Sequence, residues 1–249
     1  GQDIHYTKLL APLGGFSQAV DAFRSSGGRG MNVTAPFKLD AFAYATDLAP
    51  SAQMAGAVNA MKFEGGKVYA ENFDGVGLVR DLLHNLGCPL RGRRVLILGA
   101  GGATRGALLP LLAEEPADLF IVNRTVEKAE ALATLALKHQ TAAVPVQGLG
   151  YAALQGQAFD VVLNATSSSL TAELPPLPAS VFAPGCLAYD LTYGKGLTPF
   201  LRLASESGVA RLADGVGMLA EQAAEAFAWW RGERPDTASV IRALTVPLR

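Results

Sequence analysis

The chain has 249 residues, of which half are hydrophobic and 17% are charged, so it can bury a sizeable core and is not expected to be disordered. Its formal net charge is −1 at pH 7, and no block of like charges indicates a nucleic acid or a membrane surface as partner. No apolar run is long enough to span a bilayer. These features predict one large or two modest globular domains. They are compatible with a small anionic ligand, because a single Arg or Lys can bind one.

The cysteine and histidine residues argue against a disulfide-stabilised protein and against a metal-binding protein. Cys88 and Cys186 are the two cysteines, and they lie far apart without a Cys-x-x-Cys pair, so neither a disulfide framework nor a zinc site is expected. The three histidines, His5, His84 and His139, show no metal-ligand spacing. We therefore expect no metal, and two reduced thiols are typical of a cytoplasmic protein.

The sequence before residue 93 predicts a mixed α/β unit. Gly27 and Gly28 follow a helical pattern and are a typical helix-stop signal. Gly65 and Gly66 separate two short strand patterns and favour a hairpin turn. The expected elements are strands at 4–9, around Val33, at 61–63 and at 67–70, with helices at 14–26 and through Phe42 and Tyr44.

From Arg93 onward, short apolar strands alternate with helices. This alternation predicts βαβ units and a parallel sheet buried on both faces, which is a doubly wound α/β domain of the Rossmann type. The expected strands are 95–98, 119–122, 143–146, 159–163, 187–191 and 209–212, and the expected helices are 103–113, 126–137, a short one near Tyr151, and 198–207.

Two helices, 215–231 and 237–244, are expected after the last strand. Because the parallel sheet ends before them, we expect these helices to return and pack on the first domain. The sequence thus predicts an α/β protein of two domains. Residues 1–74 with 215–249 would form a mixed α/β substrate-binding domain, and residues 75–214 would form the dinucleotide-binding domain.

The sequence Gly-Ala-Gly-Gly-Ala at 99–103 follows the first strand of the parallel series and opens a helix. Glycine permits positive φ and close approach to a ligand, and a helix N-terminus offers N–H groups to a pyrophosphate. A tight turn without a ligand is the alternative, but the position at the head of a βαβ series favours a dinucleotide site. The last residue replaces the third glycine of the fingerprint, which tolerates a small side chain. The expected cofactor-binding residues here are Gly99, Ala100, Gly101, Gly102 and Ala103.

The residues after the second parallel strand select the cofactor. An NAD site usually places Asp or Glu there to bind the ribose 2′-hydroxyl, whereas this chain has Asn123, Arg124 and Thr125. A guanidinium matches a 2′-phosphate in charge and geometry, and the two neutral side chains can add hydrogen bonds. The alternative is a helix cap at Thr125 beside a solvated Arg124. We expect NADP as the cofactor of a nicotinamide-dependent oxidoreductase.

Three polar segments precede the glycine turn, at 32–38, 56–60 and 72–75. Reduction of a ketone by a nicotinamide needs a proton donor and groups that hold the carbonyl. Taken singly, each segment has an ordinary structural explanation. Lys38 fits a solvated helix residue, Asp74 fits a turn or a helix cap, and Asn59 fits a turn cap. Only their combination points to catalysis.

The combined segments resemble the shikimate dehydrogenase family. Seven motifs occur in the family's order and spacing, from about Ile4 to the C-terminus, and this agreement argues against a chance resemblance. They are GMNVTAPFK at 30–38, GAVN at 56–59, NFDG at 72–75, GAGGA at 99–103, NRT at 123–125, NATSS at 164–168 and GVGMLAEQA at 215–223.

This resemblance implies the reversible, NADPH-dependent reduction of 3-dehydroshikimate to shikimate in aromatic amino-acid biosynthesis. It implies that Lys38 and Asp74 form the catalytic pair, and it leaves open which of them transfers the proton. The implied substrate-binding residues are Thr34, Asn59 and Gln222 at the ring hydroxyls and Tyr193 toward the carboxylate. The further implied cofactor contacts are Thr166 and Ser167, with Leu191 and Gly215 lining the nicotinamide.

Three features depart from the family pattern. Phe73 replaces the usual Thr beside Asp74, and Ser169 replaces a common Gly after the NATSS loop. The family also opens with a strand and a helix that carry a Ser-x-Ser pair for the substrate carboxylate, and this sequence starts beyond them. We therefore expect an incomplete or truncated sequence, and a protein truncated there is expected to bind its substrate poorly.

Three other functions fit parts of the pattern. A quinate/shikimate dehydrogenase with relaxed cofactor use shares the motifs, although Arg124 argues against a preference for NAD. A non-catalytic relative that senses a metabolite fits the departure at the start, although Lys38 and Asp74 argue against it. A folate-type dehydrogenase shares the two-domain plan, but the polar set of Thr34, Asn59 and Gln222 favours a polyhydroxylated ring. A monomer or a homodimer is expected.

Overall fold

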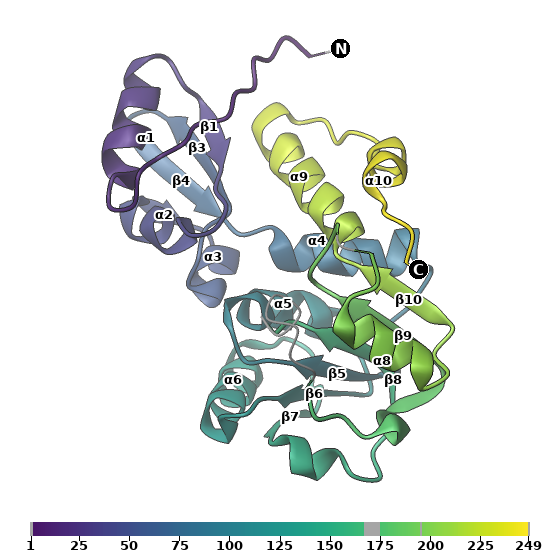
Figure 1. Cartoon of the computed structure of the whole chain (residues 1–249). Coiled ribbons are helices and arrows are strands. Elements are labelled where there is room, and N and C mark those ends of the chain that lie inside the picture. The colour runs from purple at the N-terminus through teal and green to yellow at the C-terminus, as the bar shows by residue number, and fades with distance from the viewer. Residues whose placement is uncertain (1, 167–174, 195, 249) are drawn as a thin grey trace. The chain divides into compact units, whose positions relative to one another are not determined.

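The computed structural model describes residues 2–166, 175–194 and 196–248. The chain divides into two compact units, residues 1–72 and 73–249, which run from purple to blue and from blue to yellow in Figure 1. The second unit includes residues 215–249, which the sequence assigns to the first domain. None of the described helices is long and apolar enough to cross a membrane.

The first unit holds a four-stranded mixed sheet in the order β1-β3-β4-β2. β3 pairs antiparallel with both β1 and β4, and β2 pairs parallel with β4, so the predicted hairpin at Gly65 and Gly66 is confirmed. The strands are β1 (Gly30–Asn32), β2 (Asp47–Leu48), β3 (Ala60–Glu64) and β4 (Lys67–Glu71), and the helices are α1 (Phe16–Ser25), α2 (Lys38–Tyr44) and α3 (Pro50–Ala55).

The prediction of a strand at 4–9 is wrong. A strand needs a partner for its backbone hydrogen bonds, and no described strand pairs with this segment. The segment is exposed, and the Tyr6 hydroxyl donates a hydrogen bond to Oδ1 of Asn32 at 2.8 Å. The core of the unit lies instead under α1, where Phe16 stacks on Phe37 with ring centres 5.6 Å apart.

The second unit contains a six-stranded, fully parallel sheet in the order β10-β9-β8-β5-β6-β7, as predicted. β7 and β10 begin later than expected. The strands are β5 (Arg94–Leu98), β6 (Asp118–Val122), β7 (Val146–Leu149), β8 (Phe159–Asn164), β9 (Phe182–Asp190) and β10 (Arg211–Asp214). The helices around them are α5 (Gly102–Ala113), α6 (Val126–His139) and α8 (Pro199–Glu206), with short turns η2 (Tyr151–Leu154) and η3 (Ala179–Val181).

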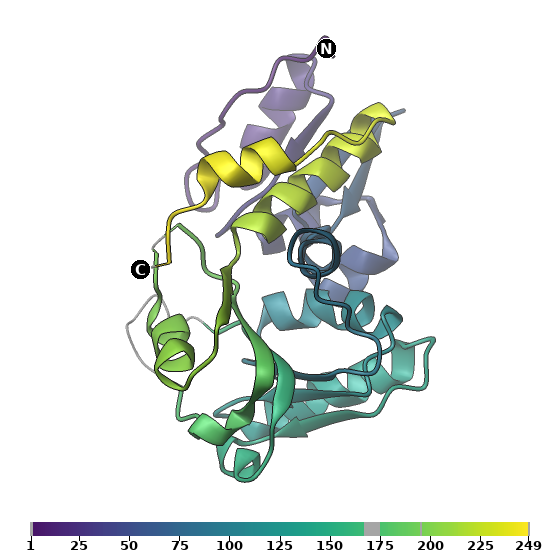
Figure 2. The ribbon, with the colours of Figure 1, turned by 90° about the vertical axis from the view of Figure 1, so that its right-hand side faces the viewer.

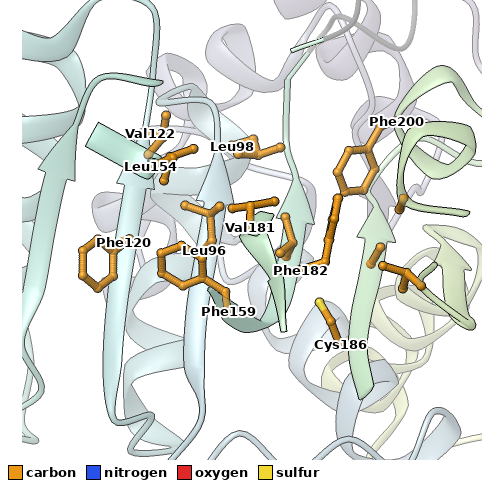
Figure 3. Packing of buried hydrophobic residues seen from close by; sticks show 14 of the residues in the cluster. Leu96, Leu98, Phe120, Val122, Leu154, Phe159, Val181, Phe182, Cys186 and Phe200 are labelled. Carbon is orange, nitrogen blue, oxygen red and sulfur yellow. The ribbon is translucent and has the colours of Figure 1, made fainter. Parts of the chain in front are cut away.

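Both faces of this sheet are buried. The helices α5 and α6 cover one face and α8 covers the other (Figures 1 and 2). On the α8 face, alternate strand residues such as Leu96 and Leu98 pack with Phe159 and Phe200 (Figure 3). Because alternate side chains of a strand point to opposite faces, a run such as 95–98 is apolar throughout.

Helices outside the sheet complete the second unit. α4 (Asp74–Arg80) continues into a π-helical turn, η1 (Asp81–Asn85), before the first parallel strand. After the last strand come α9 (Val216–Arg231) and α10 (Ala238–Leu244). α9 packs along α4, and α10 packs on α9. Of the two closing helices, α9 thus contacts the helix that leads into the sheet, and α10 contacts α9.

Candidate active site and nucleotide-binding edge

The expected cofactor residues gather at one edge of the parallel sheet. The glycine turn follows β5, Asn123 follows β6, Thr166 follows β8, Leu191 follows β9 and Gly215 follows β10. Parallel strands end on the same side, so these residues share the carboxyl edge. The strand order reverses between β5 and β8, and such a switch point is where ligands bind in open α/β sheets.

Gly99 turns the chain at the end of β5. Its φ of +99° lies in the left-handed region, where side chains with a Cβ are strained. Its N–H donates to the Val122 carbonyl at 2.7 Å, and its own carbonyl accepts from the Thr104 hydroxyl at 2.7 Å. A Cβ at this position would also stand 3.1 Å from Cγ2 of Thr166. The turn is therefore fixed from both neighbouring strands.

The next residues form an open cradle at the start of α5. Gly101, Gly102 and Ala103 are exposed, and a Cβ on either glycine would meet no atom within 4 Å. No side chain in the described part of the chain caps this helix. Backbone N–H groups at a helix N-terminus suit an anion, so the cradle fits the pyrophosphate of a dinucleotide.

The segment after β6 presents the expected 2′-phosphate residues. Arg124 and Thr125 are exposed, and Asn123 donates through Nδ2 to the Thr125 carbonyl at 2.9 Å. Thr125 occupies the N-cap position of α6, but its side chain makes no capping hydrogen bond. Burial raises the pKa of Tyr151, and the charge of Arg124 opposes that rise. The segment thus offers a cation beside neutral polar groups.

A buried polar network joins the ends of β8 and β9. Asp190 is fully buried, and its Oδ2 accepts hydrogen bonds from Asn164 at 3.2 Å and from the Thr198 hydroxyl at 2.6 Å. Asn164 in turn accepts from the Thr166 hydroxyl at 2.7 Å. This network fixes the start of the NATSS loop. Ser167 and Ser169 lie outside the described residues.

The two residues expected at the nicotinamide are neighbours. Gly215 is buried, and its N–H donates to the Thr192 carbonyl at 3.3 Å. A Cβ on Gly215 would collide with the carbonyl oxygen of Leu191. Close packing of β9 and β10 at their carboxyl ends therefore requires glycine here.

One expected catalytic residue and two expected substrate-binding residues lie together in the first unit. The N–H of Val33 donates to the Asn59 carbonyl at 2.8 Å, and the N–H of Val58 donates to the Lys38 carbonyl at 3.0 Å. These bonds bring the Thr34, Lys38 and Asn59 segments together at one end of the sheet. Asn59 is buried, Lys38 is half-buried and Thr34 is exposed.

The other expected catalytic and substrate-binding residues belong to the second unit. Asp74 opens α4, and Gln222 lies on α9, where its Nε2 donates to the Leu219 carbonyl at 2.9 Å. α4 and α9 pack side by side, so these two side chains belong to one helix pair. Phe73, the departure from the family pattern, packs edge-to-face on Trp229 of α9 with ring centres 5.8 Å apart. Tyr193 is exposed beyond β9.

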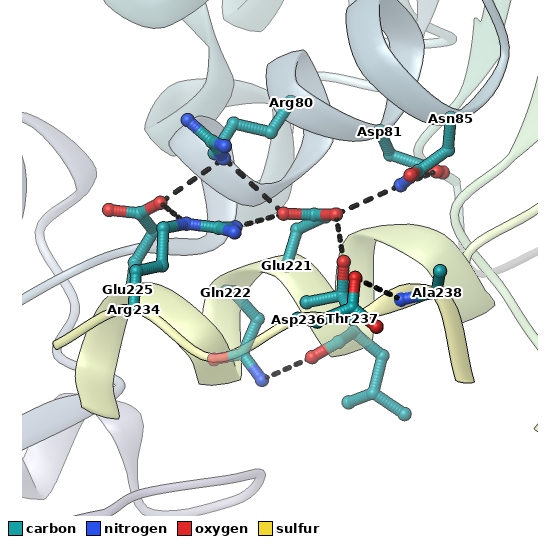
Figure 4. A network of polar contacts seen from close by, with 11 residues as sticks. Arg80, Asp81, Asn85, Glu221, Gln222, Glu225, Arg234, Asp236, Thr237 and Ala238 are labelled. Atoms are coloured by element: carbon teal, nitrogen blue, oxygen red, sulfur yellow. Dashed lines mark hydrogen bonds and ion pairs between the residues drawn. The ribbon is translucent and has the colours of Figure 1, made fainter. Parts of the chain in front are cut away.

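Sequence reasoning missed the buried carboxylates between these helices. Glu221 is 2% exposed and Asp81 is 3% exposed. The two acids and Gln222 are drawn in Figure 4, where Glu221 and Gln222 project from different sides of α9. Glu221 takes hydrogen bonds or ion pairs from Arg80, Asn85, Arg234 and Thr237. The available signal was the apolar residues near each acid, which are Leu78, Val79 and Leu82 for Asp81 and the segment from Val216 to Ala220 for Glu221.

Three family models match the chain. The shikimate dehydrogenase substrate binding domain matches residues 1–61, the shikimate / quinate 5-dehydrogenase model matches 81–172, and the shikimate 5′-dehydrogenase C-terminal domain matches 215–245. The chain is also 56% identical to a shikimate dehydrogenase (NADP(+)) of Chromobacterium violaceum, covering 98% of this chain and 88% of that protein. A protein of the same name from Aromatoleum aromaticum is 54% identical, with coverages of 98% and 87%.

Solved structures are similar to the chain over almost its whole length. An Ael1 enzyme from Pseudomonas putida is 61% identical with a TM-score of 0.89, covering 96% of this chain and 86% of that one. A shikimate 5-dehydrogenase from Thermus thermophilus in complex with NADP(H) and shikimate is 31% identical with a TM-score of 0.78, at coverages of 94% and 84%. A 5-ketofructose reductase of Gluconobacter is 30% identical with a TM-score of 0.78, also at 94% and 84%.

Proposed function

Because the chain belongs to the shikimate dehydrogenase family, we propose that Lys38 and Asp74 form the catalytic pair of its NADP-dependent reaction. The chain is an NADP-dependent shikimate dehydrogenase, which reduces 3-dehydroshikimate to shikimate reversibly in aromatic amino-acid biosynthesis. The observation that carries this conclusion is the similarity of almost the whole chain to relatives that bear this name.

NADPH supplies the hydride that reduces the ketone carbon. Negative charge develops on the carbonyl oxygen as the hydride arrives, so a cationic hydrogen-bond donor beside that oxygen lowers the barrier. The Lys38 ammonium fits this task, and we assign the Asp74 carboxylate to the same proton-transfer pair. Both side chains are half-buried at the first residue of a helix, which supports the assignment because a half-buried polar side chain is still accessible to a substrate.

The remaining polar residues recognise the ring. We assign Thr34, Asn59 and Gln222 to the ring hydroxyls and Tyr193 to the carboxylate end. The burial of Asn59 supports this role, since a polar site built around substrate hydroxyls rejects analogues that lack them. On this assignment the substrate domain comprises 1–74 with 215–249, and the NADP domain comprises 75–214.

The carboxyl edge of the parallel sheet binds NADP. We assign the pyrophosphate to the cradle of Gly101 and Gly102, and the 2′-phosphate to Arg124, whose guanidinium can make two parallel hydrogen bonds with a phosphate. Thr166 and Ser167 contact the cofactor, and Leu191 and Gly215 line the nicotinamide. We also propose a cytoplasmic location, and an active species that is a monomer or a homodimer.

The test follows the nicotinamide absorbance of the purified chain with shikimate and NADP⁺. We expect reduction of NADP⁺, with NAD⁺ used less efficiently and quinate turned over slowly. Quinate turnover at a rate comparable to shikimate would establish the quinate/shikimate alternative. Binding of NADP⁺ and shikimate without any turnover would instead identify a metabolite-sensing relative and refute the catalytic assignment.

A further inference from the structure

Asp81 is a buried carboxylate that the proposed reaction does not use. It stands at the first residue of η1, directly after α4, and is 3% exposed. The hydroxyl of Tyr189, a fully buried residue of β9, donates to its Oδ2 at 2.8 Å. Asn85 donates to its Oδ1 at 2.9 Å. The carboxylate therefore has directed partners on both oxygens.

The same carboxylate lies against the start of α9. A Cβ on Gly217 would overlap both carboxylate oxygens of Asp81, so only glycine allows this approach. α9 is 16 residues long and begins at Val216, and a negative charge at the first turn of a helix is favourable because the helix dipole is positive there. Asp81 thus holds the first turn of α9 and the end of strand β9 at a fixed distance.

Both contacts point to the residues assigned to the nicotinamide. Tyr189 of β9 precedes Leu191 by two residues, and Gly217 of α9 follows Gly215 by two residues. Leu191 and Gly215 already pack backbone to backbone. The carboxylate of Asp81 therefore contacts both segments, the end of β9 and the start of α9, that adjoin the residues assigned to the nicotinamide.

Packing alone does not require an acid at this position. Burial raises the pKa of Asp81, and the nearby charges of Glu221 and Asp214 raise it further, against the hydrogen bonds from Asn85 and Tyr189. A buried carboxylate is costly to desolvate, and an apolar side chain would avoid that cost. What an apolar side chain lacks is the directional bond to Tyr189 and the charge at the start of α9.

We propose that Asp81 is a positioning residue for the nicotinamide ring, acting through Tyr189 and Gly217 on Leu191 and Gly215. This inference rests on the proposed function, which assigns the latter two residues to the nicotinamide. Small displacements of reacting atoms reduce rates steeply. The expected defect is therefore in hydride transfer rather than in the binding of the adenosine half of the cofactor.

The test compares Tyr189→Phe and Asp81→Asn with the unaltered chain. In Tyr189→Phe we expect kcat to fall about tenfold, and the isotope effect with NADPH deuterated at C4 to rise as hydride transfer becomes rate-limiting. Affinity for adenosine 2′,5′-bisphosphate, which lacks the nicotinamide, should stay unchanged. The matched control is Tyr44→Phe, which removes a tyrosine hydroxyl bonded to Asp21 in the first unit, and it should change neither kcat nor the isotope effect.

The outcomes separate the inference from the proposed function. Unchanged kcat and isotope effect in the folded Tyr189→Phe variant would overturn the inference, as would an equal loss of affinity for the bisphosphate and for NADP⁺. If Asp81→Asn does not fold, Tyr189→Phe still decides. If the unaltered chain shows no turnover, the proposed function fails. The inference is then tested by binding alone. A loss of affinity for NADP⁺ but not for adenosine 2′,5′-bisphosphate supports it, and an unchanged ratio of these two affinities overturns it.

Discussion

Gly77 of α4 lies directly against Gln222 of α9, since a Cβ on residue 77 would stand 2.8 Å from the Gln222 backbone nitrogen. Asp74 precedes Gly77 by one helical turn. The absence of a side chain at residue 77 therefore sets the spacing of the helix pair that carries both Asp74 and Gln222.

Replacing Gly77 by Ala is expected to destabilise the chain and to weaken substrate binding. The added methyl has no space, and overpacking of this kind costs about 1–3 kcal/mol. Separation of the helices should raise KM for shikimate more than KM for NADP⁺. Denaturant unfolding and steady-state kinetics measure the two effects. Gly101→Ala is the control, because a Cβ there meets no atom within 4 Å; it should leave unfolding unchanged and raise KM for NADP⁺. Equal stability of the two variants would contradict the prediction.

Replacing Arg124 by Ala is expected to remove discrimination between cofactors. A charge-assisted hydrogen bond contributes about 1.5–3 kcal/mol, so KM for NADPH should rise roughly tenfold to a hundredfold. KM for NADH should hardly change, since NADH has no 2′-phosphate. Initial rates with both cofactors over a concentration series measure this. An equal rise of both KM values would show that Arg124 does not contact the 2′-phosphate.

Replacing Lys38 by Ala is expected to abolish turnover while shikimate binding persists. General acid–base catalysis contributes about 10²–10⁴-fold, so kcat should fall by at least two orders of magnitude. Substrate affinity, measured by calorimetry, should change little because other side chains are assigned to the ring hydroxyls. Lys62→Ala is the control, since Lys62 pairs with Glu64 on β3 and has no assigned role in the reaction, and it should retain full activity. A Lys38→Ala variant with near-normal kcat would refute the catalytic role.

The elements that the sequence predicts well are those with a local chemical cause. The glycine turn at Gly99 and the polar segment at Arg124 follow apolar strands, so their placement at the carboxyl edge follows from strand direction alone. The limits of β7 could not be read locally. They depend on its pairing with β6, in which Leu119 lies opposite Val146 and Val122 opposite Leu149, and the apolar residues just before Val146 imitate a strand.

The buried carboxylates escaped prediction for a related reason. Asp81 and Glu221 lie in helical segments that also carry partly exposed charges, such as Arg80 and Glu225, and a single acid in such a segment is usually solvated. Their burial results from partners distant in sequence, such as Tyr189 for Asp81 and Arg80 for Glu221. No local pattern encodes such partners, whereas the family motifs pointed to Gln222, the direct neighbour of Glu221.

The cysteines are expected to resist alkylation in the folded chain. Burial raises the pKa of the Cys186 thiol to about 12, and burial also raises that of Cys88, so almost no thiolate forms near neutral pH. Because the thiolate is the nucleophile, iodoacetamide at pH 8 should label neither residue in the native protein and both in denaturant. Intact-mass spectrometry counts the added groups. Rapid native labelling of Cys186 would contradict its burial.

Glu221 is expected to make stability depend on pH in the acid range. Desolvation raises its pKa, but hydrogen bonds from Thr237 and Asn85 and the charge of Arg234 outweigh it, so the net pKa lies below the usual 4.5. A carboxyl whose pKa is lower in the folded state stabilises the fold above its unfolded pKa, and that stability disappears as pH falls through the folded pKa. The unfolding free energy of the unaltered chain should exceed that of Glu221→Gln by about 2 kcal/mol at pH 7, and the difference should shrink steadily below pH 4.5.

Glu127→Gln, a change on the exposed first turn of α6, corrects for the general titration of surface acids. A difference between the unaltered chain and Glu221→Gln that is independent of pH would show that Glu221 contributes packing rather than charge.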